Sequence, residues 1–181
     1  MTLTMRKTTE ADVAAAEAIL MDGKAALAAL GVPQWQGGPE AYPNRIELLE
    51  DIANGAGYVA VNEAGELVGT LALSLAGEDT YDEIDGTWLT TSDSTSPRYA
   101  VIHRCAVSAM AAHQGVMSFM FEECERLSRE AGAESMRIDT HALNKPLQGL
   151  VAKRGYTHCG TITLPYEDER DPMRIAFEKL L

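Results

Sequence analysis

The chain has 181 residues, 46% of them hydrophobic, which is enough for one domain with a sizeable core and leaves little room for a second. We therefore expect a single domain over residues 1–181. A formal charge of -12, from 15 basic and 27 acidic residues, argues against a general DNA or RNA binder because nucleic-acid phosphates would be repelled. Such a charge would attract cationic small molecules, although surface acids that only keep the protein soluble explain it equally simply.

The location of the protein is suggested by what the sequence lacks. No apolar run approaches the length of a membrane span, and the N-terminal "MTLTMRKTTEADV" has no apolar stretch like that of a secretion signal. We expect a cytoplasmic protein without a membrane partner. Cys105, Cys124 and Cys159 are odd in number, far apart and in no CxxC pair, so they are predicted to be reduced, mostly buried thiols.

Two helices are predicted in the first third of the chain. The first is capped by Thr9 or Asp12 and ends at Gly31. Its apolar stripe comprises Val13, Ala16, Ile19, Leu20, Leu27 and Leu30. The second helix covers residues 44–55, with Asn44 as its cap, and it carries Ile46, Leu49 and Ile52 on one face.

A β-hairpin is expected next, formed by strands at residues 57–63 and 66–75 around the turn-forming "NEAG". Residues 77–97 are polar and acidic, which predicts a long loop or lid. A strand at residues 98–107 then leads into a loop of small residues.

The second half alternates helices and strands. After Gly115 a helix is predicted, with apolar residues at helical spacing, and Gly132 ends it. Further elements are expected as a strand at 135–140, a helix at 144–154, and strands at 156–164 and 173–181. This order predicts an α/β sheet with an antiparallel first half and helices on both faces.

The stretch "HRCAVSAMAAHQGVMS", residues 103–118, runs from a strand through a turn into a helix. The backbone N–H groups at the start of a helix lack intrahelical partners and favour an anion. We interpret this loop as an anion cradle, with an ordinary strand-to-helix turn as the alternative.

The chain resembles the GCN5-related N-acetyltransferases (GNAT) across nearly its whole length, in three places. "HRCAVSAMAAHQGVMS" is similar to the family's strand and acetyl-CoA pyrophosphate loop, with Gly115 at the central glycine. "IDTHALNKPLQGLVAKRGYTHCG" resembles the late strand, asparagine-led helix and glycine-aromatic ending, and "RKTTEADV" the opening strand and helix cap. The resemblance implies a GNAT-type mixed, mostly antiparallel central sheet flanked by helices on both faces.

The resemblance also implies an activity, the transfer of an acetyl group from acetyl-CoA as cosubstrate to an amine by direct attack. The implied contacts to acetyl-CoA are made by Cys105, Ala106, Val107, His113, Gln114, Gly115, Val116, Met117, Ser118 and Asn144. The sequence departs from the family pattern at Ala112, where glutamine or arginine is usual, and at Met117, where a small residue is usual. The loss of a cationic side chain forfeits a charge-assisted hydrogen bond of roughly 1.5–3 kcal/mol.

The catalytic base is predicted to be His103, which matches the position of a base in the family and whose neutral imidazole can accept a proton from an ammonium. Because side chains alternate along a strand, Arg104 should face the other side, where a carboxylate of the first helix or the acidic loop is its expected partner. Glu83 is the competing base, with Asp85 beside it. Val151 stands where the family often has a tyrosine as general acid, which leaves Cys159, Tyr99, a water or no acid at all.

The acceptor is expected to be a small amine or amino-acid-like molecule, bound by Trp35, Gln36 and Tyr42 between the first two helices. Core packing of Trp35 is an equally good explanation. The histidines show neither HxxxH nor HExxH spacing, so no metal is predicted. A non-catalytic acyl-CoA-binding sensor or interaction protein on the same scaffold remains the alternative function, and the oligomeric state is open to a homodimer.

Overall fold

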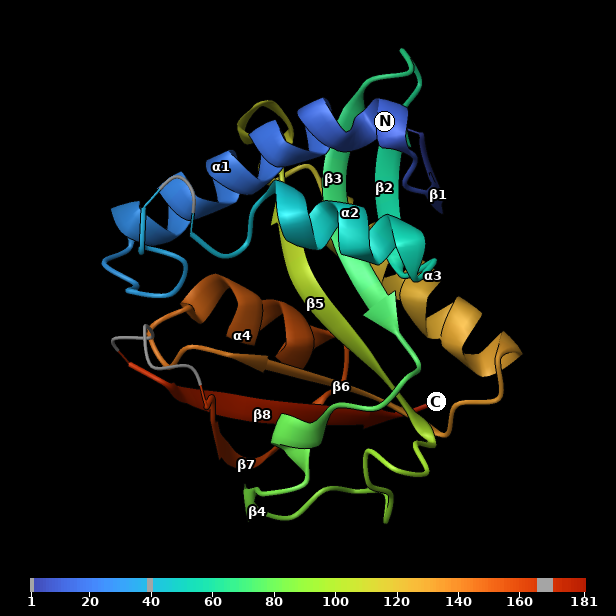
Figure 1. Ribbon diagram of the computed structural model, residues 1–181, viewed down its shortest axis with the longest axis vertical. Helices are drawn as coiled ribbons and strands as arrows, with labels where there is room; N and C mark the ends of the chain where they lie inside the picture. The colour runs from blue at the N-terminus through green and yellow to red at the C-terminus, as the bar shows by residue number, and fades with distance from the viewer. Residues whose placement is uncertain (1, 39–40, 166–170) are drawn as a thin grey trace. The chain divides into compact units, whose positions relative to one another are not determined.

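The computed structural model describes residues 2–38, 41–165 and 171–181 (Figure 1). It has a mixed, mostly antiparallel α/β architecture, which confirms the predicted fold class. The contacts within the chain divide it into two compact units, which we describe separately. The prediction of one domain over residues 1–181 stays a prediction. Among the described residues no helix is both long and apolar enough to cross a membrane.

The first unit comprises Met1–Ala29, Trp35–Leu73 and His103–Cys124. Its strands lie in the order β1-β2-β3-β5. They are β1 (Leu3–Lys7), β2 (Gly57–Asn62), β3 (Leu67–Ser74) and the C-terminal part of β5 (Tyr99–Val107). The pairs β1–β2 and β2–β3 are antiparallel, so the predicted hairpin is confirmed.

Helices cover both faces of this part of the sheet. They are α1 (Val13–Ala29), α2 (Arg45–Ala53) and the beginning of α3 (Val116–Glu130). On one face, α1 and α2 pack with Ala106 of β5 around a core of Val13, Ala16, Ile19, Leu20 and Leu48. On the other face α3 approaches Gly69 of β3, where a Cβ atom would lie 2.7 Å from Sδ of Met120. The glycine therefore permits the close approach of α3.

The predicted helix caps are confirmed in this unit. Thr9 forms a capping box with Asp12 at the 3₁₀ turn Glu10–Asp12 that precedes α1, and Asn44 caps α2 by accepting a hydrogen bond from the N–H of Ile46 at 2.7 Å. Arg6 also holds Asp12, through a pair of hydrogen bonds of 2.7 and 2.9 Å. These contacts fix where both helices begin.

The apolar stripes of the two helices are not buried throughout. Ile46 and Leu49 of α2 are 62% and 41% exposed, whereas Ile52 packs against the core and the buried residues of α2 are Leu48 and Asp51. A charged residue occupies the inner face because Asp51 pairs with an arginine of β5, and sequence periodicity cannot anticipate that. Leu30, expected to complete the stripe of α1, lies beyond the end of the helix and is 52% exposed.

The second unit comprises Leu30–Gln34, Ser74–Ile102 and Glu125–Leu181. Its strands follow the order β5-β6-β8-β7-β4. Those not yet introduced are β4 (Asp85–Gly86), β6 (Ser135–Thr140), β7 (Thr157–Thr163) and β8 (Met173–Leu180). The start of β5 pairs with β6 in parallel, and the pairs β6–β8, β7–β8 and β4–β7 are antiparallel. With the helix α4 (Lys145–Lys153), every element predicted for this half of the chain is present.

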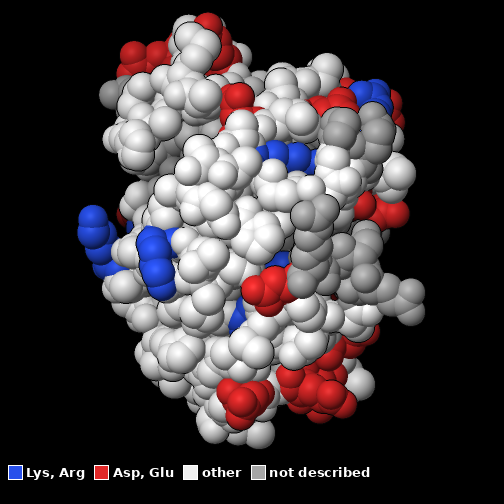
Figure 2. Space-filling view, turned by 90° about the vertical axis from the view of Figure 1, so that its left-hand side faces the viewer, with Lys and Arg blue, Asp and Glu red and all other residues white. Residues whose placement is uncertain are grey.

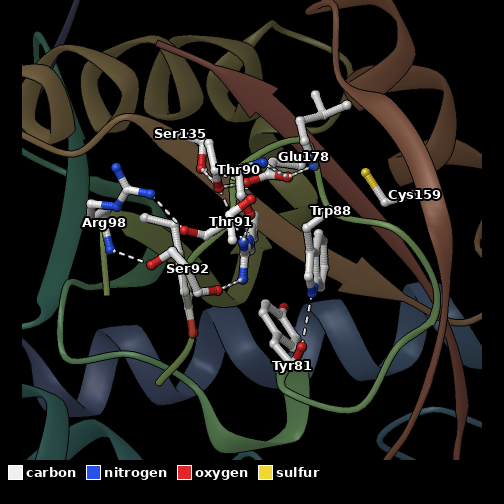
Figure 3. A network of polar contacts seen from close by, with 12 residues as sticks. Tyr81, Trp88, Thr90, Thr91, Ser92, Arg98, Ser135, Cys159 and Glu178 are labelled. Atoms are coloured by element: carbon white, nitrogen blue, oxygen red, sulfur yellow. Dashed lines mark hydrogen bonds and ion pairs between the residues drawn. The ribbon is translucent and has the colours of Figure 1, made fainter. Parts of the chain in front are cut away.

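The segment at residues 77–97, expected as a long loop or lid, is packed onto this unit. It contains the 3₁₀ turn Asp79–Tyr81 and strand β4. Tyr81 is 1% exposed in a cluster with Tyr99 and residues of β5, β7 and β8, and Trp88 packs against that cluster. The indole N–H of Trp88 donates to the carbonyl of Tyr81 at 2.8 Å (Figure 3). The segment is therefore held in place by buried aromatic side chains.

A buried ion pair anchors the same segment. The guanidinium of Arg137 in β6 lies 3.0 Å from a carboxylate oxygen of Glu178 in β8, and neither side chain is exposed. Glu178 also accepts hydrogen bonds from the hydroxyls of Thr90 and Ser135 (Figure 3). The guanidinium lies over the ring of Tyr99 at 3.8 Å and over that of Trp88 at 4.3 Å, so each charge has several partners.

The protonation of Glu178 follows from these contacts. Burial alone would raise the pKa of its carboxyl, but hydrogen bonds from Ser135, Thr90 and Arg137 outweigh burial and lower the pKa. Glu178 is thus held as a carboxylate inside the protein, where it balances the charge of Arg137.

Replacing Glu178 by Gln should lower the free energy of unfolding by about 3–5 kcal/mol near neutral pH, because Arg137 would stay buried without a counter-charge. Since the folded-state pKa of Glu178 is lowered, its contribution is complete above the unfolded value of about 4.3 and is lost as the pH falls further. The difference between the two proteins, measured by urea unfolding, should therefore shrink below about pH 4. The control is Glu134→Gln, whose partner Arg98 is half-exposed, with an expected cost below about 1 kcal/mol. An equal cost in both variants would refute the role of the buried pair.

Candidate functional site

The predicted anion loop lies in the first unit, between the end of β5 and α3. Its start is tied to the sheet because the N–H of Ser108 donates to the carbonyl of Val68 at 3.0 Å. A 3₁₀ turn follows at Ala109–Ala111, and Ala111 is 4% exposed. Residues 112–115 are exposed. The loop is thus anchored at its base and open at its tip.

The tip has an unusual backbone. His113 and Gly115 adopt positive φ angles of 62° and 82°. The first hydrogen bond of the helix runs from the N–H of Phe119 to the carbonyl of Gly115 at 3.0 Å, so the N–H groups of residues 116–118 precede the helical ladder. A left-handed residue followed by a helix start forms a concave arrangement of N–H groups that suits an anion. A Cβ on Gly115 would meet no atom within 4 Å, so the backbone can be approached there.

The strand residues proposed to contact acetyl-CoA differ in burial. Ala106 is 4% exposed and packs in the core between the sheet and α1. Cys105 and Val107 are half-buried. The side chain of Ala106 is therefore part of the core, and only its backbone atoms are left for the proposed contact with acetyl-CoA.

Arg104 interrupts the expected alternation along β5, since its φ angle is 52°. Its Nε donates to Oδ2 of Asp51 at 3.0 Å, Nη2 bonds the other carboxylate oxygen, and Nη1 donates to the hydroxyl of Tyr42 at 3.3 Å. The carboxylate therefore comes from α2, and the expectation of one from the first helix or the acidic loop was wrong. Burial alone would lower the pKa of Arg104, but Tyr42 and Asp51 raise it, so this arginine is permanently charged.

His103, the proposed base, is half-buried one residue before this irregular position. A simple count of alternating side chains cannot assign its direction across a left-handed residue, because such a residue turns the strand. Its catalytic role stays a prediction. The sequence did not predict Asp51 as the partner of Arg104. The signal that could have found it is its spacing, since residues three positions apart, such as Leu48 and Asp51, share one face of a helix.

The proposed acceptor wall also lies in the first unit. A shallow pocket of about 260 Å³ is lined by Met21, Lys24, Ala25, Trp35, Gln36 and Gly38. The side chain of Gln36 donates to the carbonyl of Lys24 at 3.0 Å, and the ammonium of Lys24 donates to the carbonyl of Ala41 at 2.6 Å. The segment between α1 and α2 is therefore fastened to α1 by polar contacts. Residues 39–40 of this segment lie outside the described residues.

Tyr42, the third residue of the proposed wall, is 43% exposed and does not line this pocket. Its hydroxyl accepts from Arg104, which connects it to the strand that carries His103. The structure thus places Trp35 and Gln36 together and Tyr42 beside Arg104.

Asn144 and Glu83 belong to the second unit. Asn144 caps α4 by accepting from the N–H of Leu147 at 3.3 Å, and its amide donates to the hydroxyl of Thr140 at 3.0 Å. The cap is confirmed, and the contact to acetyl-CoA stays a prediction. Glu83 is exposed between the 3₁₀ turn and β4.

The candidates for a general acid have structural surroundings in the same unit. The hydroxyl of Tyr99 accepts from the N–H of Glu78 at 3.1 Å, while its ring lies under Arg137. Burial raises the pKa of the Cys159 thiol, and the negative charge of nearby Glu178 raises it to a smaller extent. Tyr156, which follows Gly155, is 7% exposed and belongs to the core. Among the described residues no group of three His, Cys, Asp or Glu side chains is arranged to hold a metal ion.

Comparison with known proteins gives the family. Residues 25–156 match the model of the acetyltransferase (GNAT) family, and the chain belongs to this family. No curated protein matches the chain significantly. Among solved structures, it is similar to a GNAT-family acetyltransferase from Streptococcus agalactiae 2603, with 27% identity, a TM-score of 0.83, and coverage of 99% of this chain and 95% of the other.

Two more distant structures share the fold. One is a putative phosphinothricin N-acetyltransferase with 19% identity, a TM-score of 0.70 and coverage of 99% of each chain. The other is a ribosomal-protein-alanine N-acetyltransferase from Brucella melitensis with 20% identity, a TM-score of 0.67 and coverage of 98% of this chain and 99% of that one. The match of residues 25–156 to the family model confirms the family prediction.

Replacing Arg104 by Lys should lower the free energy of unfolding by about 1.5–3 kcal/mol, since an ammonium cannot make the two parallel hydrogen bonds to Asp51. Chemical denaturation measures the change. Arg45→Lys is the matched control, because Arg45 is 3.5 Å from half-exposed Glu17 and should cost less than about 1 kcal/mol. Equal stability of Arg104→Lys and the unmodified protein would contradict a stabilising pair.

Proposed function

We propose that the protein is an N-acetyltransferase that transfers an acetyl group directly from acetyl-CoA to a small amine or amino-acid-like acceptor. The observation that carries the proposal is the backbone at residues 113–118, where left-handed His113 and Gly115 precede the open end of α3. Successive N–H groups and the helix dipole suit an anion with several charged oxygens, such as a pyrophosphate.

The fit of this loop to acetyl-CoA rests on the backbone. The open space over Gly115 lets an anion approach the N–H groups without meeting a side chain. Ala112, which replaces the usual glutamine or arginine, is exposed at the edge of the loop and offers no charge. Backbone contacts are therefore expected to supply most of the affinity. Acetyl-CoA, when bound, brings the acetyl group as a thioester that an amine can attack.

His103 is proposed to take the proton from the acceptor ammonium, either directly or through one water. It stands on the strand that leads into the loop, next to Arg104, whose charge is balanced by Asp51. Glu83 is the weaker candidate, since it is exposed on the second unit. Cys105, Ala106 and Val107 are proposed to line the thioester with their backbone, and Asn144 to contact acetyl-CoA from its helix start.

The acceptor is proposed to be small because Trp35 and Gln36, which line the shallow pocket, offer flat apolar area with polar edges that suit a small molecule. The structural neighbours are named for acceptors as different as phosphinothricin and the alanine of a ribosomal protein, so the shared fold does not decide between them. On the face shown in Figure 2, Asp and Glu gather in separate clusters. A cationic acceptor agrees with the charge of -12, although no single acidic surface covers this face.

A non-catalytic acyl-CoA sensor on the same scaffold is the competing function, suggested by Ala112, Met117 and Val151. Titration with acetyl-CoA, followed by measurement of free thiol in the presence of a panel of amines, separates the two. Binding with amine-dependent thiol release supports the enzyme. Binding without release for every amine supports the sensor, and absence of binding refutes both.

Substituting Gly115 by Val should weaken acetyl-CoA binding by at least about tenfold, because the side chain enters the open space over the loop and strains a left-handed residue. Isothermal titration gives the dissociation constant. Gly132→Val is the control for strain, since Gly132 has a φ of 85° and also no atom within 4 Å of its Cβ position. Equal affinity in the Gly115 and Gly132 variants would exclude the loop as the anion site.

Substituting His103 by Ala should reduce turnover about 10²–10⁴-fold and leave acetyl-CoA affinity nearly unchanged, as expected for a general base. Steady-state kinetics with one amine acceptor measure the change. His158→Ala, which changes an exposed histidine of β7, should keep full turnover. Full activity in His103→Ala would transfer the role to Glu83 or to solvent.

A further inference from the structure

The start of the loop is bonded to an acidic side chain of α1. Oδ2 of Asp22 accepts a hydrogen bond from the N–H of Ala109 at 2.7 Å. Ala109 opens the 3₁₀ turn that leads to the tip of the loop, and Asp22 is separated from it by 87 residues of sequence. A hydrogen bond from a neutral N–H to a carboxylate is among the stronger kinds.

A glycine next to Asp22 allows this contact. A Cβ on Gly23 would lie 3.0 Å from Cβ of Ala106, which is tighter than ordinary packing, so α1 runs unusually close to β5 at this turn. Only Val107 and Ser108 separate Ala106 from Ala109 in the sequence. The pair Asp22–Gly23 thus combines close helix–strand packing with a carboxylate that reaches the loop.

The carboxylate is unexpected on electrostatic grounds, because a negative charge beside an anion site should weaken anion binding. It is, however, bonded to Ala109 at the base of the loop, whereas the anion is proposed to bind further along, at the tip of the loop and the start of α3. Within this stretch the N–H of Gln114 is already used, since it donates to the carbonyl of Ala111 at 3.3 Å. With Ser108 bonded to Val68, the carboxylate leaves two successive N–H groups at the base engaged. The base of the loop therefore has one defined position relative to α1 and β3.

We propose that Asp22 is a positioning residue, which fixes the base of the loop so that backbone N–H groups at its tip and at the start of α3 meet the pyrophosphate of acetyl-CoA. The inference rests on the proposed function for the identity of the anion. Substitutions of Asp22 separate hydrogen bonding from charge, because both Asn and Ala remove the charge but only Asn retains an acceptor oxygen.

Three readouts test the proposal. Asp22→Ala should raise the dissociation constant for acetyl-CoA about tenfold or more, as the loss of a charge-assisted hydrogen bond predicts. Asp22→Asn should stay within about threefold of the unmodified protein, since its amide oxygen can still accept from Ala109. With S-acetylpantetheine, a donor without a pyrophosphate, kcat/KM should be the same in all three proteins.

Amide hydrogen exchange of the protein without ligand supplies the readout that does not depend on acetyl-CoA. The N–H of Ala109 should exchange faster in Asp22→Ala than in Asp22→Asn. Glu17→Ala, which removes another acid from α1, is the control and should change neither exchange at Ala109 nor acetyl-CoA affinity.

The outcomes separate this proposal from the function on which it rests. Unchanged or tighter acetyl-CoA binding in Asp22→Ala, with binding by the unmodified protein intact, overturns the positioning role alone. Absence of binding by the unmodified protein refutes the proposed function. Unchanged exchange at Ala109 in Asp22→Ala contradicts the positioning role whatever the ligand.

Discussion

The ion pair between Arg104 of β5 and Asp51 of α2 is the constraint on which the arrangement of the first unit depends. It holds a left-handed, non-glycine residue in the strand, a conformation that costs free energy unless its surroundings enforce it. Both partners are largely buried, with 18% and 9% of their side chains exposed, so neither can leave the other without a large penalty. The left-handed residue in β5 is therefore held by a side chain of α2.

One turn of α1 contacts two parts of the proposed site. Lys24 and Gln36 fasten the loop that carries Trp35, while Asp22 bonds the base of the anion loop. Gly23 makes this possible, since a larger residue would collide with Ala106. Because these contacts share a single helical turn, a displacement of α1 would move the loop that carries Trp35 and the loop that begins at Ser108 together.

The sequence was sufficient for the elements and for the loop, and it failed where side chains had to be placed. Strong local signals such as the cap at Asn44 and Gly115 before α3 depend on neighbouring residues only, and they were predicted correctly. The inner face of α2 was not, because Asp51 is buried by a partner 53 residues away. The contact of Asp22 with Ala109 was missed for the same reason, and no period of apolar residues reports it.

The acidic segment at residues 77–97 shows how a charge count and the use of charges differ. Asp82 accepts from the N–H and hydroxyl of Ser94 at 2.9 and 2.6 Å, and Asp93 accepts from the hydroxyl of Thr95 at 2.6 Å. The hydrogen bond from Thr95 is the largest of the effects that lower the pKa of Asp93, so Asp93 stays charged. These carboxylates organise turns of their own segment, as local side-chain to backbone bonds commonly do. At Asp82 and Asp93, therefore, the negative charge serves the local structure of the segment.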